Sequence, residues 1–453
     1  MKTSSNPKKI AWSAFLAVAL YFVLPASMPE LGKRTVCIFA AAVMLWVSEA
    51  LPLYATSLCV VALEILFLAE KGGLAREGGI SFKQFLDPFA SDIIILFMGG
   101  FMLSKAMTKH GVDSAIASRL LYPMARGPLT LVYGVLLVTA ALSMWMSNTA
   151  TAAMMLAITA PLLKKIPESD RFRGAIALAV PFGANIGGIG TPIGTPPNAI
   201  CMAILRGAGY KIGFLDWVAF AVPLMLIILA AAGLVIYLLH RPQTGFSQAA
   251  FKIESRPLTA NGKTVLAVLG LTIALWLTTD WHGLNEGAVA LLAFTLLAVL
   301  ENLDFKDIRS IEWDILILMW GGLSLSSAMT LSGLTAWFGG LPLTELSPRA
   351  MDAFFIVFSI GLSTFMSNTA SANIVTPLAL AAAKASPVSA AILAAIGSSL
   401  DIALPVSTPP NALAYATGAV TAKQMLRASI IITAVSIPLL LIWSRYVLPL
   451  FSF

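Results

Sequence analysis

Four short polar segments interrupt long apolar stretches of this chain and carry residue types that can bind ions. Ser147-Asn148-Thr149 recurs as Ser367-Asn368-Thr369, and Thr195-Pro196-Pro197-Asn198 recurs as Thr408-Pro409-Pro410-Asn411. Hydroxyl, amide and carbonyl oxygens are ligands of hard cations such as sodium. Proline lacks an amide donor and interrupts a helix, which frees backbone groups. The repeated segments therefore predict two related cation sites, one in each half.

The same interruptions could hold an anion. A helix N-terminus carries partial positive charge and unpaired N–H groups. No lysine or arginine occurs in 137–157 or in 357–377, around the two tripeptides. We therefore expect converging helix N-termini and bound sodium to hold an anionic solute together.

Each motif taken alone also has a structural interpretation. Ser-Asn-Thr is a common helix cap and Pro-Pro a common loop, but their ordered recurrence favours a functional role. The glycine-rich run 183–194 lacks the lysine and flanking strand of a nucleotide loop. Close helix packing and local unwinding are the expectation there.

Three acidic residues lie at or near membrane depth: Asp401, Glu49 and Glu64. Such groups are functional candidates, and a proton relay through Asp401 stays open. Its counterpart in the first half is Gly188, so a symmetric site does not require it. Capping or exposure at the membrane interface is the expectation for Glu49.

Composition sets the class of the protein. Of 453 residues, 58% are apolar and 11% charged, against roughly a quarter charged in a soluble domain. Each membrane span needs about 20 apolar residues, and ten or eleven such stretches occur. The sequence predicts an all-α polytopic membrane protein.

Other classes find little support. The net charge of +7 comes from basic residues scattered through loops, which indicates membrane topology rather than a nucleic-acid partner. The cysteines Cys37, Cys59 and Cys201 have no metal-ligand spacing and are expected to be buried thiols. No pair of nucleophile and base is evident, so an enzyme is disfavoured.

The chain divides into two repeats. We expect an N-terminal helix in 1–33, retained rather than cleaved as a signal peptide, a first repeat in 34–240, a cytoplasmic linker in 241–263 and a second repeat in 264–453. Three landmarks recur in order: the stretches beginning at Asp92 and Asp314, the tripeptides, and the Pro-Pro segments. The expected elements are spans near 10–27, 34–53, 54–70 and 90–108, a hairpin at 128–165, a broken span at 172–206, and spans at 213–240, 264–280, 285–301 and 312–332, followed by a hairpin at 350–384, a broken span at 388–418 and a last span at 425–447.

Basic residues suggest that both hairpins are re-entrant. Lysines and arginines flank the first hairpin on both sides, as in cytoplasmic loops, whereas the second has only Arg349 and Lys384 at its ends. Each half then crosses the membrane an odd number of times, and the halves are inverted, as in secondary transporters. The N-terminus is expected in the cytoplasm and the C-terminus outside.

This doubled pattern of Ser-Asn-Thr hairpin and Thr-Pro-Pro-Asn break resembles the divalent anion/sodium symporters of the ion transporter superfamily. The similarity covers nearly the whole chain. It implies sodium-coupled transport of C4-dicarboxylates or citrate, although some members carry sulfate and some exchange dicarboxylates without sodium. It also implies a lipid-embedded homodimer in a bacterial inner membrane. Spans 1–4 and 7–9 would form a scaffold, and the hairpins and broken spans a domain that moves as an elevator.

The resemblance also assigns residues to sites. Sodium site 1 would comprise Ser143, Ser147, Asn148 and the backbone near Gly190 and Gly194. Sodium site 2 would comprise Ser363, Asn368 and the backbone near Met366 and Ser407. The substrate carboxylates would contact Asn148, Thr149, Asn368, Thr369 and Thr408, against Pro196 and Pro409.

The leading hypothesis is a sodium-coupled symporter of a C4-dicarboxylate such as succinate, malate or fumarate. Both tripeptides are complete, which favours sodium coupling over exchange. The alternatives are a sodium-independent dicarboxylate exchanger and a proton-coupled citrate or sulfate carrier, and a channel is a further class. The sequence does not decide which anion is carried, the sodium stoichiometry or the conformational state.

Overall fold

The computed structural model describes residues 6–70, 79–243, 257–341, 347–451 and 453. In these segments the chain is almost entirely helical, and the one β pairing is an isolated bridge between Ala69 and Ile80. Part of the expected linker 241–263 lies outside the described residues. Six helices among those described are long and apolar enough to cross a membrane: Glu30–Ser48, Lys83–Lys109, Phe214–Leu239, Ala260–Leu277, Trp313–Leu331 and Ala422–Leu450.

The remaining expected crossings are shorter or interrupted. The first half contains α1 (Pro7–Val23), α2 (Glu30–Ser48), α3 (Leu53–Leu68), α4 (Lys83–Leu86), α5 (Asp92–Lys109), α6 (Val112–Leu121), α7 (Pro128–Ser143), α8 (Asn148–Leu163), α9 (Phe172–Gly188), α10 (Pro196–Gly207) and α11 (Phe214–Leu239). The expected hairpin corresponds to α7 and α8, and the expected broken span to α9 and α10.

The second half repeats this order. It contains α12 (Ala260–Leu277), α13 (Thr279–His282), α14 (Glu286–Val299), α15 (Phe305–Arg309), α16 (Trp313–Leu331), α17 (Leu334–Gly339), α18 (Pro348–Ser363), α19 (Asn368–Ala382), α20 (Pro387–Ser399), α21 (Pro409–Ala416) and α22 (Ala422–Tyr446). Here the hairpin is α18 with α19, and the broken span is α20 with α21.

Local chemistry sets where the hairpin helices begin. The Ser147 hydroxyl accepts from the Ala150 amide at 3.3 Å and caps α8. Ser367 caps α19 in the same way, at 3.2 Å from the Ala370 amide. A serine at the N-cap satisfies an amide that has no partner within the helix. The tripeptides therefore act as helix starts in both hairpins.

The proline pairs set the second interruption. α10 and α21 each begin with two prolines, and the preceding Thr195 and Thr408 are extended. Proline fits the first turn of a helix because the amide there has no intrahelical partner. Each broken span is thus two helices separated by an irregular segment.

Small residues let α7 and α9 approach closely. A Cβ on Gly183 would lie 2.5 Å from the Leu136 carbonyl oxygen, and one on Gly187 would lie 2.4 Å from the Ala140 Cα. The glycines of this run therefore serve helix packing, as the sequence predicts.

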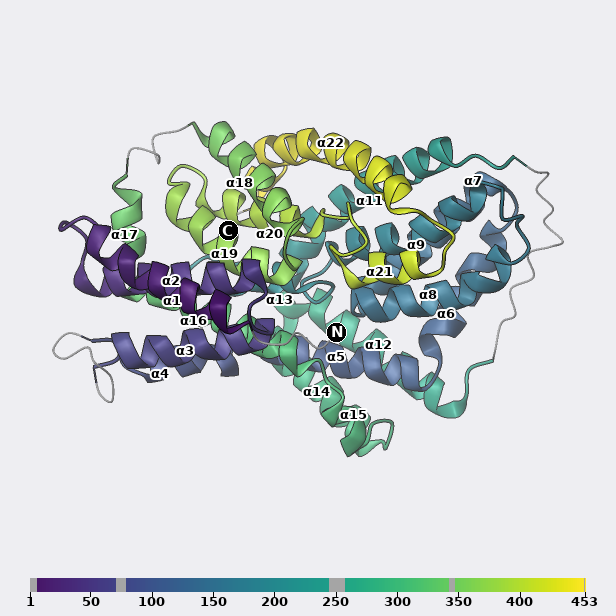
Figure 1. The fold of residues 1–453 in the computed structure, drawn as a ribbon. Coiled ribbons are helices and arrows are strands. Elements are labelled where there is room, and N and C mark those ends of the chain that lie inside the picture. The colour runs from purple at the N-terminus through teal and green to yellow at the C-terminus, as the bar shows by residue number, and fades with distance from the viewer. Residues whose placement is uncertain (1–5, 71–78, 244–256, 342–346, 452) are drawn as a thin grey trace.

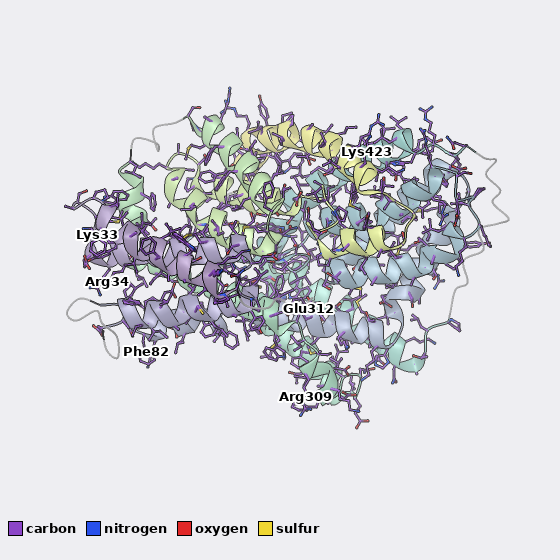
Figure 2. The ribbon with its side chains drawn as sticks, in the orientation of Figure 1. Lys33, Arg34, Phe82, Arg309, Glu312 and Lys423 are labelled. Carbon is purple, nitrogen blue, oxygen red and sulfur yellow. The ribbon has the colours of Figure 1, made fainter. Side chains whose placement is uncertain are left out.

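The two hairpins lie on opposite sides of the structure, with α7 and α8 at the right of Figure 1 and α18 and α19 at the left. Each half also contacts the other near the interruptions: α8 packs against α21, and α10 packs against α19. Figure 2 places Lys33 and Arg34 at the left edge and Lys423 at the upper right, whereas Glu312 lies near the centre. The interruptions of each half therefore lie against helices of the other half.

Candidate functional site

The tip of the first hairpin forms a cluster of oxygen atoms. One terminal atom of the Asn148 amide lies 2.7 Å from Ser143 Oγ, 3.1 Å from the Ala184 carbonyl oxygen and 3.2 Å from the Gly194 carbonyl oxygen. If that atom is the amide nitrogen, it donates to all three. If it is the oxygen, it lies within 3.2 Å of three other oxygens, and oxygens are the ligands that a sodium ion takes. These residues therefore fit a sodium ion, and a rotation of one amide separates the two states.

Backbone packing at this tip leaves no room for larger residues. A Cβ on Gly194 would lie 2.5 Å from the Gly188 carbonyl oxygen, and one on Gly188 would lie 2.7 Å from Asn148 Oδ1. Gly190 packs instead against the side chains of Met144 and Met225. Of the two glycines predicted for sodium site 1, Gly194 contributes its carbonyl oxygen to the cluster.

The second hairpin tip has a matching arrangement. Ser363 Oγ lies 2.9 Å from Asn368 Oδ1, with the same spacing in sequence as Ser143 and Asn148. Ser363 also donates to the Ser398 carbonyl oxygen at 2.7 Å. Ser407 is buried and accepts from the Leu404 amide at 3.2 Å, and Met366 is buried in an apolar cluster behind the tip.

The asparagines of the Thr-Pro-Pro-Asn segments hold the interruptions together. Asn198 Nδ2 lies 2.9 Å from the Gly188 oxygen, 3.2 Å from the Ile189 oxygen and 2.7 Å from the Thr191 oxygen. Asn411 Nδ2 donates to the Leu404 oxygen at 2.9 Å. The expectation that the interruptions leave their carbonyls free is therefore wrong for these four oxygens. A buried carbonyl is stable when it is hydrogen-bonded. Asn198 supplies the donor for three of these oxygens, and Asn411 supplies it for the fourth.

A residue absent from the sequence prediction joins the two halves. Asn185 on α9 donates to Thr408 Oγ1 at 3.1 Å and to Asn411 Oδ1 at 3.3 Å, and it is buried. Its only signal in the sequence is an amide within the apolar, glycine-rich stretch before the first interruption. Thr408, which was predicted to contact substrate, is thus held from the opposite half.

The other predicted substrate residues differ in accessibility. Thr149 and Pro409 are exposed, Pro196 is half-buried, and Thr369 is buried at 9% exposed. Thr149 follows Asn148 in the first turn of α8, as Thr369 follows Asn368 in α19.

Glu312 is a second residue that the sequence prediction missed. Its carboxylate lies near the Ser147 hydroxyl at the first hairpin tip. Glu312 is the N-cap of α16, in the second half of the chain. An acidic side chain therefore lies beside the tip that is predicted to bind sodium.

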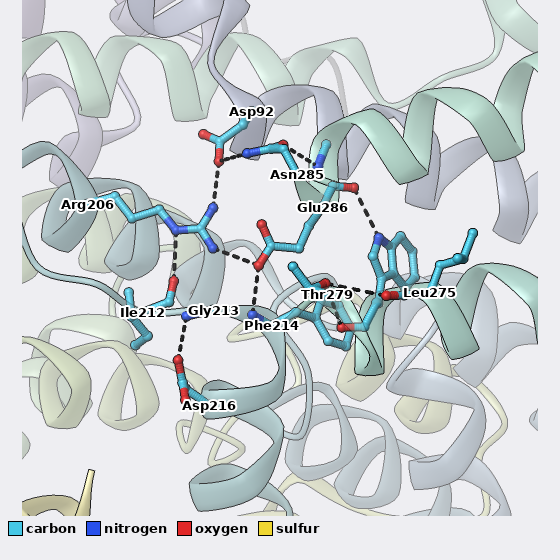
Figure 3. A network of polar contacts seen from close by, with 12 residues as sticks. Asp92, Arg206, Ile212, Gly213, Phe214, Asp216, Leu275, Thr279, Asn285 and Glu286 are labelled. Atoms are coloured by element: carbon cyan, nitrogen blue, oxygen red, sulfur yellow. Dashed lines mark hydrogen bonds and ion pairs between the residues drawn. The ribbon is translucent and has the colours of Figure 1, made fainter. Parts of the chain in front are cut away.

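Arg206 ties the end of α10 to two other helices. Its guanidinium lies 2.5 Å from Asp92 Oδ2 on α5 and 3.0 Å from Glu286 Oε1 on α14 (Figure 3). The same Glu286 oxygen accepts from the Phe214 amide at 2.9 Å. Arginine can donate to two carboxylates at once through its planar fork, so one side chain fixes α10 against both helices.

Comparisons with known proteins place this site in context. The profile of the sodium:sulfate symporter transmembrane region matches residues 3–453. The chain is 32% identical to an uncharacterized transporter of Haemophilus influenzae, over 93% of this chain and 94% of that protein. It is 28% identical to the sodium-dependent dicarboxylate transporter SdcS of Staphylococcus saprophyticus, over 95% of this chain and 89% of the relative.

Two solved structures share the fold. The YdaH transporter of Alcanivorax borkumensis aligns with a TM-score of 0.57 and 16% identity, over 90% of this chain and 99% of the other. Neisseria gonorrhoeae MtrF aligns with a TM-score of 0.57 and 14% identity, over 95% of this chain and 97% of the other. At these identities the likeness concerns the architecture alone.

Proposed function

The chain belongs to the sodium:sulfate symporter family, and from that premise we propose that this sodium-coupled membrane transporter carries C4-dicarboxylates. The observation that carries the proposal is the duplication of one polar tip. Ser143 with Asn148 and Ser363 with Asn368 form the same contact in the two halves. Two equivalent helix starts suit a solute with a carboxylate at each end. The name of the Staphylococcus saprophyticus relative supports the same substrate class.

Sodium would bind at both tips. In the first, the Ser143 hydroxyl and the carbonyl oxygens of Ala184 and Gly194 lie within 3.2 Å of one terminal atom of the Asn148 amide. In the second, Ser363, Asn368 and the Ser398 carbonyl oxygen are the corresponding groups. Ser147, Gly190, Met366 and Ser407 remain proposed neighbours of these sites.

Sodium binding would couple to anion binding through Asn148 and Asn368. When an asparagine oxygen turns toward sodium, its amide nitrogen turns away and becomes available to another acceptor. A substrate carboxylate that contacts Thr149, Thr369 or Thr408, beside Pro196 and Pro409, would meet that donor. Sodium should then raise anion affinity, and the anion should raise sodium affinity by the same factor.

The transport cycle is proposed to be an elevator in a homodimer with inverted halves. Hairpins on opposite sides of the structure support this geometry (Figure 1), as does the contact of each hairpin with the broken span of the other half. The hairpins and broken spans would move together as one body. Such rigid movement around a fixed site is how inverted-repeat transporters alternate access.

Thermal stability of the purified protein tests this function. Succinate, citrate and sulfate should each be added with and without sodium, with potassium as the control cation. The proposal predicts that succinate raises the unfolding temperature only when sodium is present. If only sulfate or only citrate stabilised the protein, that anion would replace the dicarboxylate as the proposed substrate. If succinate raised the unfolding temperature equally in potassium and in sodium, the result would contradict sodium coupling.

A further inference from the structure

Asp401 stands in the second interruption, where the repeated motif has no acidic residue. It follows the end of α20, and its counterpart in the first half is Gly188. The residue is 1% exposed. A buried carboxylate is unfavourable unless it is neutralised or paired, so this position calls for an explanation.

The carboxylate lies beside the second hairpin tip. Asp401 Oδ1 is 3.3 Å from Thr364 Oγ1 and 3.3 Å from the Ala403 amide nitrogen. Thr364 directly follows Ser363, whose hydroxyl contacts Asn368 and the Ser398 oxygen. The Ser407 hydroxyl also lies near the carboxylate. Asp401 is therefore next to the cluster proposed to bind sodium.

Among the described residues, the donors around Asp401 leave one of its two carboxylate oxygens without a hydrogen bond. The second oxygen, Oδ2, is buried and has no hydrogen-bond partner in the part of the chain that the structure describes, and the same holds for Ser399 Oγ. None of the ion pairs formed by the described residues involves Asp401. An ionised Asp401 would therefore need a cation, which the unpartnered Oδ2 could bind.

We propose that Asp401 is an anionic ligand of a monovalent hard cation, sodium or lithium, at the second hairpin tip. This inference rests on the proposed sodium coupling and adds an asymmetry to it. Asp401 has no counterpart at the first tip, where position 188 is glycine and a Cβ would lie 2.7 Å from Asn148 Oδ1. The second tip carries a full charge. A carboxylate strengthens cation binding by direct attraction in a buried setting, so Asp401 raises the affinity of the second tip for sodium.

Sodium titrations of unfolding temperature test this inference with two variants. Asp401→Asn keeps the shape of the side chain and removes its charge. Asp352→Asn is the matched control, because Asp352 is also buried, is surrounded by the hydroxyls of Ser386, Ser389 and Ser444, and contacts the opposite end of α20. We expect Asp401→Asn to raise the half-saturating sodium concentration at least tenfold and Asp352→Asn to leave it within twofold of wild type.

The outcomes separate this inference from the proposed function. If Asp401→Asn and the wild type have the same half-saturating sodium concentration, Asp401 is not a cation ligand, and the proposed sodium coupling is unaffected. A wild-type protein that sodium and lithium do not stabilise relative to potassium overturns both. Should Asp401→Asn fail to fold, hydrogen exchange on the wild-type protein decides. Amides of 400–408 should be protected by sodium and not by potassium, and equal exchange in the two salts overturns the inference.

Discussion

Asn185 on α9 donates its amide to Thr408 Oγ1 at 3.1 Å, which connects the middle of the first half to the interruption in the second. Substituting Asn185 with leucine should remove this link and leave the Thr408 and Asn411 oxygens without a buried donor. Loss of a buried partner costs about 1–3 kcal/mol. We expect a lower unfolding temperature and weaker succinate stabilisation. A variant with wild-type values for both would show that the link is dispensable.

Substituting Gly188 tests whether sodium binding at the first tip requires a residue without a side chain at this position. In Gly188→Ala the new Cβ would lie 2.7 Å from Asn148 Oδ1 and 3.0 Å from the Gly194 oxygen. We expect the half-saturating sodium concentration for uptake to rise roughly tenfold, which corresponds to about 1.4 kcal/mol. Gly270→Ala on α12 is the control, because no atom lies within 4 Å of a Cβ there. Identical sodium dependence in both variants would contradict the site.

Arg206 is predicted to stabilise the structure through its two carboxylate partners. Arg206→Met leaves Glu286, whose side chain is 6% exposed, without its cation. Breaking a buried ion pair lowers the free energy of unfolding by roughly 3–5 kcal/mol. Because Arg206 is partly exposed, we expect a smaller loss here, about 2–3 kcal/mol. Chemical or thermal unfolding measures it. Adding Glu286→Gln should recover part of the loss, whereas an unchanged single variant would show that the contacts contribute little.

His240, just beyond the end of α11, should make stability depend on pH. Its burial, with further contributions from the nearby charges of Arg171 and Arg427, lowers the pKa of the imidazole below its ordinary value of 6.5. The folded protein then binds a proton less readily than the unfolded chain. Stability should therefore fall as pH decreases through 6.5. Unfolding temperatures between pH 8 and 5.5 should drop less in His240→Gln, and an equal drop would exclude this residue as the cause.

The hairpins and interruptions could be predicted because their signals are local. A serine cap before α8 and proline pairs before α10 and α21 mark helix starts in the sequence itself. The recurrence of these signals then divides the chain into halves. The length of uninterrupted helices was harder to predict: α3 has 16 residues and α14 has 14, shorter than the 20 or so expected of a span.

Long-range partners could not be predicted in this way. Arg206 meets Asp92 across 114 positions and Glu286 across 80, and nothing near any of these residues indicates the pairing. Asn198 was visible as part of a motif, but its task of satisfying the Gly188, Ile189 and Thr191 oxygens depends on how the chain turns between them. Polar contacts of this kind follow from the packing of helices, which the periodicity of one sequence does not specify.

Uptake of labelled succinate into vesicles tests the central claim most directly. Purified protein would be reconstituted with an inward sodium gradient, equal pH on both sides and a clamped membrane potential. We predict concentrative uptake by wild type, loss of uptake in Asn148→Ala and Asn368→Ala, and normal uptake in Asn6→Ala, whose asparagine caps α1. Uptake that persists in either tip variant, or that proceeds equally without sodium, would contradict the account.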